Sequence, residues 1–402
     1  MRTVFSFFTM LCFFLICSPM ANAKNIDGGI CGENLVWIIS EDSVLSIKGR
    51  GDMYNYEYPD NQSPWSIYST LIKEIYVEDG VSTIGKDAFI FCENVVSVCI
   101  CSSVTYIGSS AFQGCKKMET INLPSNLKYL GDGAFFWCFK LSSISIPNGI
   151  KRIEDQTFVA CENLTSVVIP ENVRSIGDRA FENCRSIKII EMSKNIHTIG
   201  SGAFAGCSNL LSIEIPPKVK TIENSTFCGC SKIKSIKIPN GVKYFGDFSF
   251  SGCDNIEDLE LPRNTKFIGS HAFSQCRGFR SDVTLRKVRH IGPWAFKGTN
   301  IQSVALPNNL DTISPWVFEN CDELESIQMP KKANFFGCSA FRGCRSLRSI
   351  VIPEGIDGVL IDAFEGCDSL SEIYIHPNQT IYGLYDKANA DLVSHIKVIE
   401  VK

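Results

Sequence analysis

The chain has 402 residues, and its 39 lysine and arginine residues against 43 aspartate and glutamate residues give a formal net charge of −4. An acidic balance argues against nucleic acid as a partner. Histidine occurs five times, which leaves few groups for acid–base catalysis or metal binding, whereas 27 phenylalanines and 19 cysteines are unusually many.

The segment from Met1 to Ala23 has the features of an export signal. Arg2 gives a positive start, an apolar run extends from Val4 to Cys17, and Ala21-Asn22-Ala23 forms a small-x-small cleavage pattern. The apolar run is shorter than the about 20 residues that span a bilayer. We therefore expect a signal peptide at 1–23 and a mature chain without a transmembrane segment.

Residues 24–65 differ from the rest of the chain. The stretch "CGENLVWIISEDSVLSIKGRGDMYNY" has the alternation of a β-hairpin, and the aromatic segment "NQSPW" follows it. This pattern predicts an N-terminal β cap.

A repeat occupies most of the remaining sequence. Phenylalanine recurs thirteen times at a constant interval, except for one interval that is a single residue shorter, at Phe89, Phe112, Phe135, Phe158, Phe181, Phe204, Phe227, Phe250, Phe273, Phe296, Phe318, Phe341 and Phe364. So long a series of equal intervals, each of about 23 residues, predicts a stack of equivalent units.

Each unit has room for one short strand and a compact return. Apolar residues nine and eleven residues after the phenylalanine alternate as in a strand, a proline ends the alternation in nine turns, and a glycine usually follows at nineteen. One unit cannot bury its apolar residues alone, so the turns must stack. We expect a parallel β-solenoid of about thirteen turns over residues 66–376, roughly 60 Å long, with a C-terminal cap at 377–402.

Cysteine follows the phenylalanine by three residues in twelve turns, at Cys92, Cys115, Cys138, Cys161, Cys184, Cys207, Cys230, Cys253, Cys276, Cys321, Cys344 and Cys367. Packing beneath the phenylalanine is the favoured interpretation, since the one remaining turn has Thr299 in this place. Disulfides between neighbouring turns remain an alternative. A metal site is disfavoured, because a ladder spreads ligands along a line instead of around a point.

The pattern resembles the BspA-like leucine-rich repeat family, whose units read much like "IPNGVKYFGDFSFSGCDNIEDLELP" at 238–262. The resemblance covers about residues 66–376, and the preceding stretch is similar to that family's N-terminal cap. Membership would imply an exported or surface protein, often an adhesin. It says less about a ligand, because a fold does not fix a function.

Binding residues are expected on the outward face of the strand. The position ten residues after the phenylalanine varies amid otherwise strict repetition, which suggests a candidate binding face; the alternative is a merely unconstrained, solvated column. Its members are Asn122, Ser145, Val168, Glu191, Glu214, Lys237, Glu260, Gln328, Val351 and Tyr374.

One irregular turn, "CRGFRSDVTLRKVRHIG", gathers a candidate basic patch of Arg277, Arg280, Arg286, Lys287 and Arg289. It could dock a sulfated glycan or an acidic partner. A bulge with solvated charges is the favoured interpretation.

Two short motifs lie outside this pattern. Arg50-Gly51-Asp52 matches an integrin-binding tripeptide but also fits a loop of the family's cap, and we favour the structural interpretation. Asn163, Asn224 and Asn378 begin sequons that could be glycosylated in a eukaryotic secretory pathway, whereas the sequon at Asn61 is followed by proline and is a poor acceptor.

Catalytic motifs are absent from the sequence, and we predict no enzyme activity, cofactor or metal. The favoured hypothesis is an adhesin-like protein, secreted or peripherally associated with the cell surface, that presents its sheet face to an extracellular protein or glycan. The alternative is a structural coat or spacer protein without a specific ligand.

Overall fold

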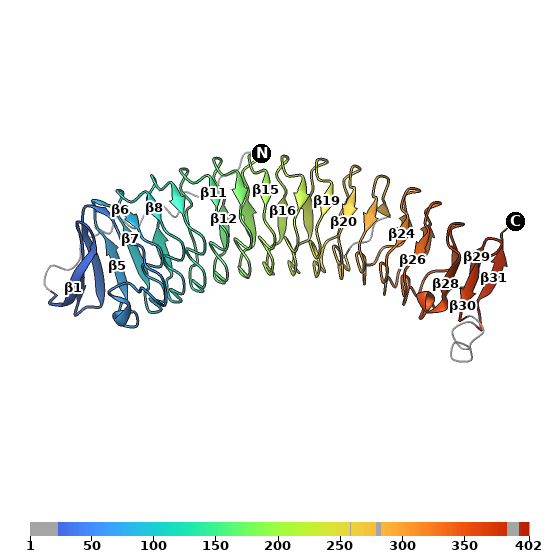
Figure 1. Ribbon diagram of the computed structural model, residues 1–402, viewed down its shortest axis with the longest axis horizontal. Helices are drawn as coiled ribbons and strands as arrows, with labels where there is room; N and C mark the ends of the chain where they lie inside the picture. The colour runs from blue at the N-terminus through green and yellow to red at the C-terminus, as the bar shows by residue number, and fades with distance from the viewer. Residues whose placement is uncertain (1–22, 258, 279–282, 384–393, 402) are drawn as a thin grey trace, which may run out of the picture.

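The computed structural model describes residues 23–257, 259–278, 283–383 and 394–401, and these form a gently curved solenoid (Figure 1). The predicted signal peptide lies outside the described residues except for Ala23. The predicted parallel β-solenoid is confirmed, because consecutive turns pair in parallel with a register offset of one repeat, as in Ser166↔Ile189 and Ser212↔Ser235.

The N-terminal residues form the predicted hairpin. Strands β1 (Asn25–Gly32), β2 (Leu35–Ser40) and β3 (Val44–Gly49) pair antiparallel, and β3 then pairs in parallel with the first strand of the solenoid. The short helix η1 (Ser66–Tyr68) follows. The hairpin therefore covers the end of the solenoid while its last strand starts the parallel ladder.

The predicted strand forms in most turns, although residues 143–146 of one turn form no strand, and these strands make up a first sheet. Its members are β5 (Glu74–Val77), β7 (Ser97–Ile100), β9 (Thr120–Asn122), β12 (Ser166–Val168), β14 (Ile189–Glu191), β16 (Ser212–Glu214), β18 (Ser235–Lys237), β21 (Val283–Thr284), β23 (Ser303–Ala305), β25 (Ser326–Gln328), β27 (Ser349–Val351), β29 (Glu372–Ile375) and β31 (Lys397–Glu400).

A second strand, which was not predicted from the sequence, lies in the return path of the turns. These strands are β4 (Gly51–Asp52), β6 (Val81–Ile84), β8 (Tyr106–Ile107), β10 (Tyr129–Leu130), β11 (Arg152–Ile153), β13 (Ser175–Ile176), β15 (Thr198–Ile199), β17 (Thr221–Ile222), β19 (Tyr244–Phe245), β20 (Phe267–Ile268), β22 (His290–Ile291), β24 (Thr312–Ile313), β26 (Phe335–Phe336), β28 (Gly358–Leu360) and β30 (Thr380–Tyr382). The helix η2 (Ile361–Phe364) follows β28.

The two rows of strands enclose the core. The short turns from the first to the second strand lie along the convex edge of the solenoid, and the loops with phenylalanine and cysteine lie along the concave edge, where η1 and η2 also lie (Figure 1). This arrangement gives the molecule two sheet faces and two edges.

The repeated phenylalanines form a continuous stack in the core. All thirteen are fully buried, and neighbouring ring centroids are 5.1–6.3 Å apart. Trp65 of the cap extends the stack by one ring, since it lies 5.5 Å from Phe89 and donates a hydrogen bond from Nε1 to the Ala88 carbonyl. Stacking gives each ring neighbours on both sides, so the turns stabilise one another.

The twelve ladder cysteines are all buried free thiols. In eleven of them Sγ donates a hydrogen bond of 3.0–3.4 Å to the carbonyl oxygen of the phenylalanine in the preceding turn. Thr299 occupies the same place in its turn, and its hydroxyl donates to the Phe296 carbonyl. Small side chains with a weak donor thus fill the space beside each ring, in agreement with the packing interpretation.

The glycine nineteen residues after the phenylalanine permits a close approach between turns. A Cβ atom on Gly246 would lie 2.6 Å from the backbone nitrogen of Asn224 in the preceding turn. A Cβ atom on Gly200 would lie at the same distance from the backbone nitrogen of Asp178. A larger residue here would push neighbouring turns apart.

Candidate binding face

The first sheet has one buried and one exposed side, as the alternation predicts. On β14, Ile190 is buried whereas Ile189 and Glu191 are exposed, and β12, β16 and β18 repeat this pattern. All ten candidate face residues are exposed except Tyr374, which is half-buried. Repetition of one strand therefore brings residues that lie one repeat apart in sequence onto one continuous surface.

Four of these residues form a row across neighbouring strands. Val168 on β12 pairs with Glu191 on β14, and Glu214 on β16 pairs with Lys237 on β18. Because β14 and β16 also pair in parallel, Glu191 and Glu214 occupy equivalent positions on adjacent strands. Like charges at such positions repel each other, so this part of the row favours a basic group from outside.

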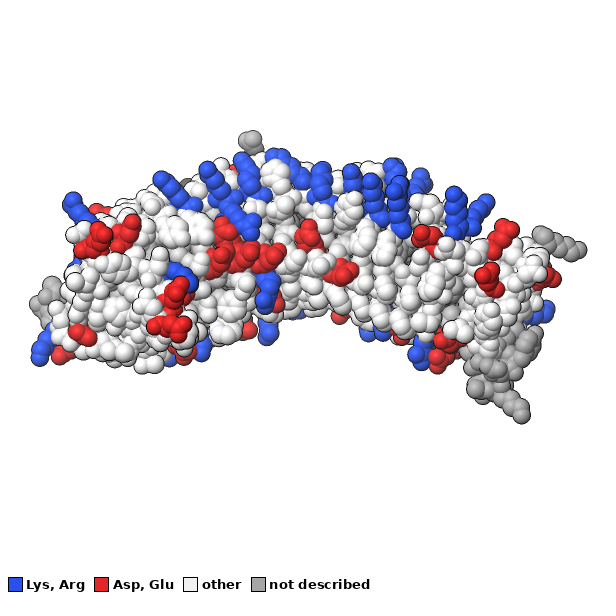
Figure 2. Space-filling model, in the orientation of Figure 1, with Lys and Arg blue, Asp and Glu red and all other residues white. Residues whose placement is uncertain are grey.

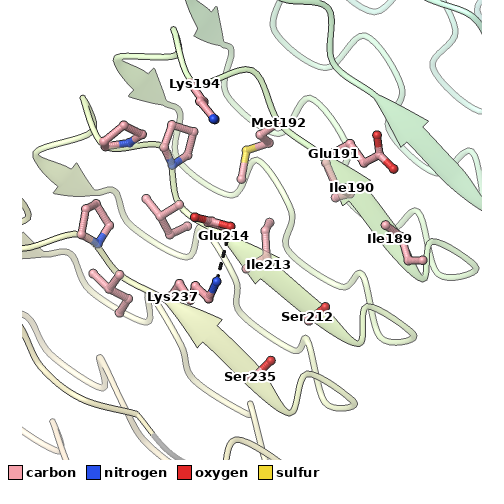
Figure 3. Close-up of a pocket in the computed structure, with 15 residues that line it drawn as sticks. Ile189, Ile190, Glu191, Met192, Lys194, Ser212, Ile213, Glu214, Ser235 and Lys237 are labelled. Atoms are coloured by element: carbon pink, nitrogen blue, oxygen red, sulfur yellow. Dashed lines mark ion pairs between the residues drawn. The ribbon is translucent and has the colours of Figure 1, made fainter. Parts of the chain in front are cut away.

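A shallow depression of about 750 Å³ borders this row (Figure 3). Ile189, Glu191, Met192, Glu214 and Lys237 are among the residues that line it. The Nζ of Lys237 lies 3.7 Å from Oε2 of Glu214, and both side chains are largely exposed. An exposed ion pair of this kind contributes little to stability and can exchange for a partner's charges.

A second depression of about 590 Å³ lies on the same face, towards the N-terminus. Ser145, Val168, Pro147 and Pro170 help to line it. The side chain of Val168 is 60% exposed, although it is aliphatic. The face therefore combines apolar and hydroxyl groups in one part with carboxylates in the next.

The predicted basic patch does not form a single cluster around one loop. Arg286, Lys287 and Arg289 precede β22 at the convex edge, whereas Arg277 lies before β21, at the other end of the first strand of that turn. Arg280 lies outside the described residues.

The three cations at the convex edge have neighbours of the same charge. The Arg289 amide donates to the Lys266 carbonyl, and the Lys266 amide donates to the Lys243 carbonyl, so these residues lie side by side in successive turns. Lys243 and Lys266 were not predicted to belong to the patch, because each lies a whole repeat away from the next in the chain. Reading the column sixteen residues after each phenylalanine would have found them.

A family model described as a BspA type leucine rich repeat region matches residues 66–188, 151–280 and 279–390. The chain belongs to this family. The predicted resemblance is thereby confirmed over most of the sequence.

Solved structures share the BspA-type fold. A leucine-rich repeat protein from Bacteroides ovatus is 22% identical with a TM-score of 0.69, and the match covers 93% of this chain and 100% of that one. A leucine rich cell surface protein from Faecalibacterium prausnitzii is 25% identical with a TM-score of 0.54, over 94% and 99% of the two chains. The pneumococcal vaccine antigen PcpA is 19% identical with a TM-score of 0.50, over 93% and 98%. The comparison with curated proteins gives no match.

The Arg50-Gly51-Asp52 tripeptide lies where the cap joins the BspA-type repeats. Gly51 and Asp52 form β4, which pairs with β6, and the Asp52 carboxylate accepts a hydrogen bond of 2.6 Å from the Ser82 hydroxyl. Gly51 has a φ of +108°, a conformation that suits glycine. These contacts give the tripeptide a role in the junction.

The three sequon asparagines are exposed. Asn224 has a structural contact as well, because its Oδ1 accepts a hydrogen bond of 2.8 Å from the Asp247 amide in the next turn. Asparagine or aspartate makes the same contact in several BspA-type turns, including Asp178 with Ser201 and Asp247 with Ser270. This inter-turn hydrogen bond was not predicted from the sequence.

The described residues contain no group of three or more His, Cys, Asp or Glu side chains suited to a metal ion. His271 stacks between Phe248 and Trp294, with centroid distances of 4.6 and 4.9 Å. Burial, followed by the charge of Lys297, lowers the pKa of His271 from its ordinary 6.5. Within the described part of the chain, no helix is long and apolar enough to cross a membrane.

Proposed function

We propose that the protein is a secreted or surface-associated, non-enzymatic binding protein of adhesin-like type, and that it presents the face of its first sheet to an extracellular protein or glycan. The observation that carries this proposal is the row of Val168, Glu191, Glu214 and Lys237 beside the 750 Å³ depression. Repeat solenoids commonly bind partners on such extended faces.

The chemistry of the face favours a partner with basic and apolar groups. Glu191 and Glu214 on adjacent strands would each accept charge-assisted hydrogen bonds from lysine or arginine. Ile189 and Val168, 53% and 60% exposed, would bury apolar surface on contact. A rigid array of parallel strands positions these groups before binding, which lowers the entropic cost of association.

The relatives support a surface role. A structure with the same fold is titled a leucine rich cell surface protein, and another is a vaccine antigen. The family model describes a repeat region and names no catalytic activity. A coat or spacer protein would share these features, so the two hypotheses must be separated by experiment.

The test is binding of the purified protein to immobilised fibronectin, laminin and collagen by surface plasmon resonance. Saturable binding to one of them is expected, and Glu191→Lys/Glu214→Lys should weaken it at least about tenfold, since charge reversal opposes a basic partner. The matched control is Glu33→Lys/Glu41→Lys, which makes the same charge change at exposed positions of the cap.

Two results would count against the proposal. Equal loss of binding in both variants would show that net charge matters and the face does not. Failure of the folded protein to bind any of the three, with concentration-dependent self-association in sedimentation, would favour the coat hypothesis.

A further inference from the structure

A row of cations follows the convex edge of the solenoid, next to the candidate binding face. Figure 2 shows lysine and arginine side chains along much of this edge. Twelve of these lysines and arginines lie in the four residues before a strand of the second sheet, namely β10, β11, β13, β15, β17, β19, β20 or β22. We call them the basic ridge: Lys128, Lys151, Arg174, Lys194, Lys218, Lys220, Lys243, Arg263, Lys266, Arg286, Lys287 and Arg289.

The ridge concentrates charge in a protein of opposite net charge. The eight four-residue segments before these strands together hold twelve of the chain's 39 lysines and arginines but only one of its 43 aspartates and glutamates, Glu171. The formal net charge of the whole chain is −4, so the remaining surface is strongly acidic by comparison. Such a separation of charge creates a field that attracts anions to one edge.

Stacking aligns one position of every turn. The residue sixteen places after the phenylalanine is lysine, arginine or histidine in eight consecutive turns: Lys128, Lys151, Arg174, His197, Lys220, Lys243, Lys266 and Arg289. Backbone hydrogen bonds connect neighbours in this column, for example from the Lys243 amide to the Lys220 carbonyl and from the His197 amide to the Arg174 carbonyl. With strands about 4.8 Å apart, the column is roughly 34 Å long.

The side chains of the column point to solvent because the preceding residue points inward. Val219, Val242 and Val288 are buried in the core at the position just before Lys220, Lys243 and Arg289. All twelve ridge residues are exposed.

Described carboxylates do not neutralise the ridge cations. None of the twelve forms an ion pair with a described carboxylate, whereas other lysines and arginines of the chain form several such pairs. The ammonium groups of Lys218 and Lys287 donate hydrogen bonds to the uncharged Asn195 and Asn264. Like charges one strand apart repel one another, so the folded chain carries a cost that an external anion would relieve.

We propose that the basic ridge binds a linear sulfated polysaccharide that lies along the convex edge. A row one or two side chains wide fits a single extended chain, and cations at every turn match anionic groups that recur at about one or two strand spacings, roughly 5 to 10 Å. Recognition depends on the sulfate charges, because the ridge lies on an outer edge and encloses no sugar ring. Lys194 also lines the depression on the sheet face, but Lys220, Lys243 and Lys266, on which the test depends, do not, so the inference does not rest on the proposed function.

The test measures binding of the purified protein to immobilised heparin over a range of sodium chloride concentrations. The logarithm of the affinity should fall linearly with the logarithm of salt concentration. The variant Lys220→Glu/Lys243→Glu/Lys266→Glu should bind at least about tenfold more weakly at physiological salt and show a shallower salt slope.

The matched control is Lys117→Glu/Lys140→Glu/Lys188→Glu, which makes the same charge change at exposed residues two or four places after a ladder cysteine. It should retain binding within about twofold, because these positions lie away from the ridge. Circular dichroism verifies that each variant is folded, and the corresponding lysine-to-glutamine triple replaces any variant that is not.

Four outcomes would overturn the proposal: no heparin binding by the wild type at low salt, equal loss in ridge and control variants, unchanged binding of the ridge variant, or equal binding to desulfated heparin. Binding of single-stranded oligothymidylate as tight as that of heparin would assign the ridge to nucleic acid and would also overturn it. Glu191→Gln/Glu214→Gln should leave heparin binding unchanged, so failure of the sheet-face proposal is distinguishable from failure of this one.

Discussion

Replacing one ladder cysteine tests whether the ladder acts by packing or through disulfides. Cys207 is fully buried, and its Sγ donates a hydrogen bond of 3.3 Å to the Phe181 carbonyl. Burial also raises its pKa well above the ordinary 9.0, so the thiol stays protonated. Cys207→Ala removes the sulfur and the hydrogen bond, and leaves the backbone and the phenylalanine stack in place.

The cost follows from three contributions. The sulfur has about the buried apolar surface of one methylene, about 0.8 kcal/mol. The cavity it leaves, roughly 25 Å³, adds about 0.6 kcal/mol. The lost hydrogen bond adds about 0.5 kcal/mol, at the low end because the Phe181 carbonyl still accepts the Cys184 amide. The expected loss in the free energy of unfolding is about 2 kcal/mol.

Urea unfolding followed by fluorescence, with and without a reducing agent, measures this loss. Cys207→Ala should lower the midpoint by the same amount in both conditions, because the ladder thiols are free. Cys228→Ala, at a half-buried cysteine outside the ladder, should cost less than about 0.5 kcal/mol. A loss of stability in Cys207→Ala that disappears on reduction, or a Cys207→Ala variant as stable as the wild type, would refute the packing argument.

Three further predictions concern other parts of the molecule. Trp65→Ala should lower the free energy of unfolding by about 3 to 5 kcal/mol and increase aggregation, because it removes the fully buried ring that joins the cap to the stack; calorimetry and light scattering measure both. The pKa of His271 is lowered in the folded state, so the stability it contributes is present above pH 6.5 and is lost as the pH falls through its folded pKa. His271→Phe should therefore reduce the fall in melting temperature below pH 6.5, and an unchanged dependence on pH would contradict the argument. Lys243→Glu, between Lys220 and Lys266, should raise the midpoint of urea unfolding at low salt by relieving repulsion worth about 0.2 to 1 kcal/mol, and added salt should reduce the gain.

Much of the architecture can be predicted from local sequence. The constant interval between phenylalanines fixes the size of a turn, and the alternation before each proline fixes which side of the first strand is buried, as Ile190 and Glu191 show. These features are readable because each depends on residues close together in the chain, and repetition strengthens the signal.

The second sheet could not be read in this way. Its strands are mostly two residues long, such as Thr198–Ile199, which is too short for an alternating pattern. They exist because the turns stack: the Gly200 amide donates to the Ile176 carbonyl one turn earlier, and a single turn has no such partner.

The surfaces were decided by tertiary structure for the same reason. The sequence suggested a basic cluster around residues 277–290, because those charges are close in the chain. Stacking instead separates Arg277 from Arg289 by a strand and places Arg289 beside Lys266, one repeat earlier in the sequence. The sequence by itself determined the repeat, its core and the outward positions of the first strand. The acidic and apolar face and the basic edge exist only because the turns stack in parallel. Hydrogen bonds between turns place equivalent residues of neighbouring repeats about one strand spacing apart, so single residues of many repeats form continuous surfaces.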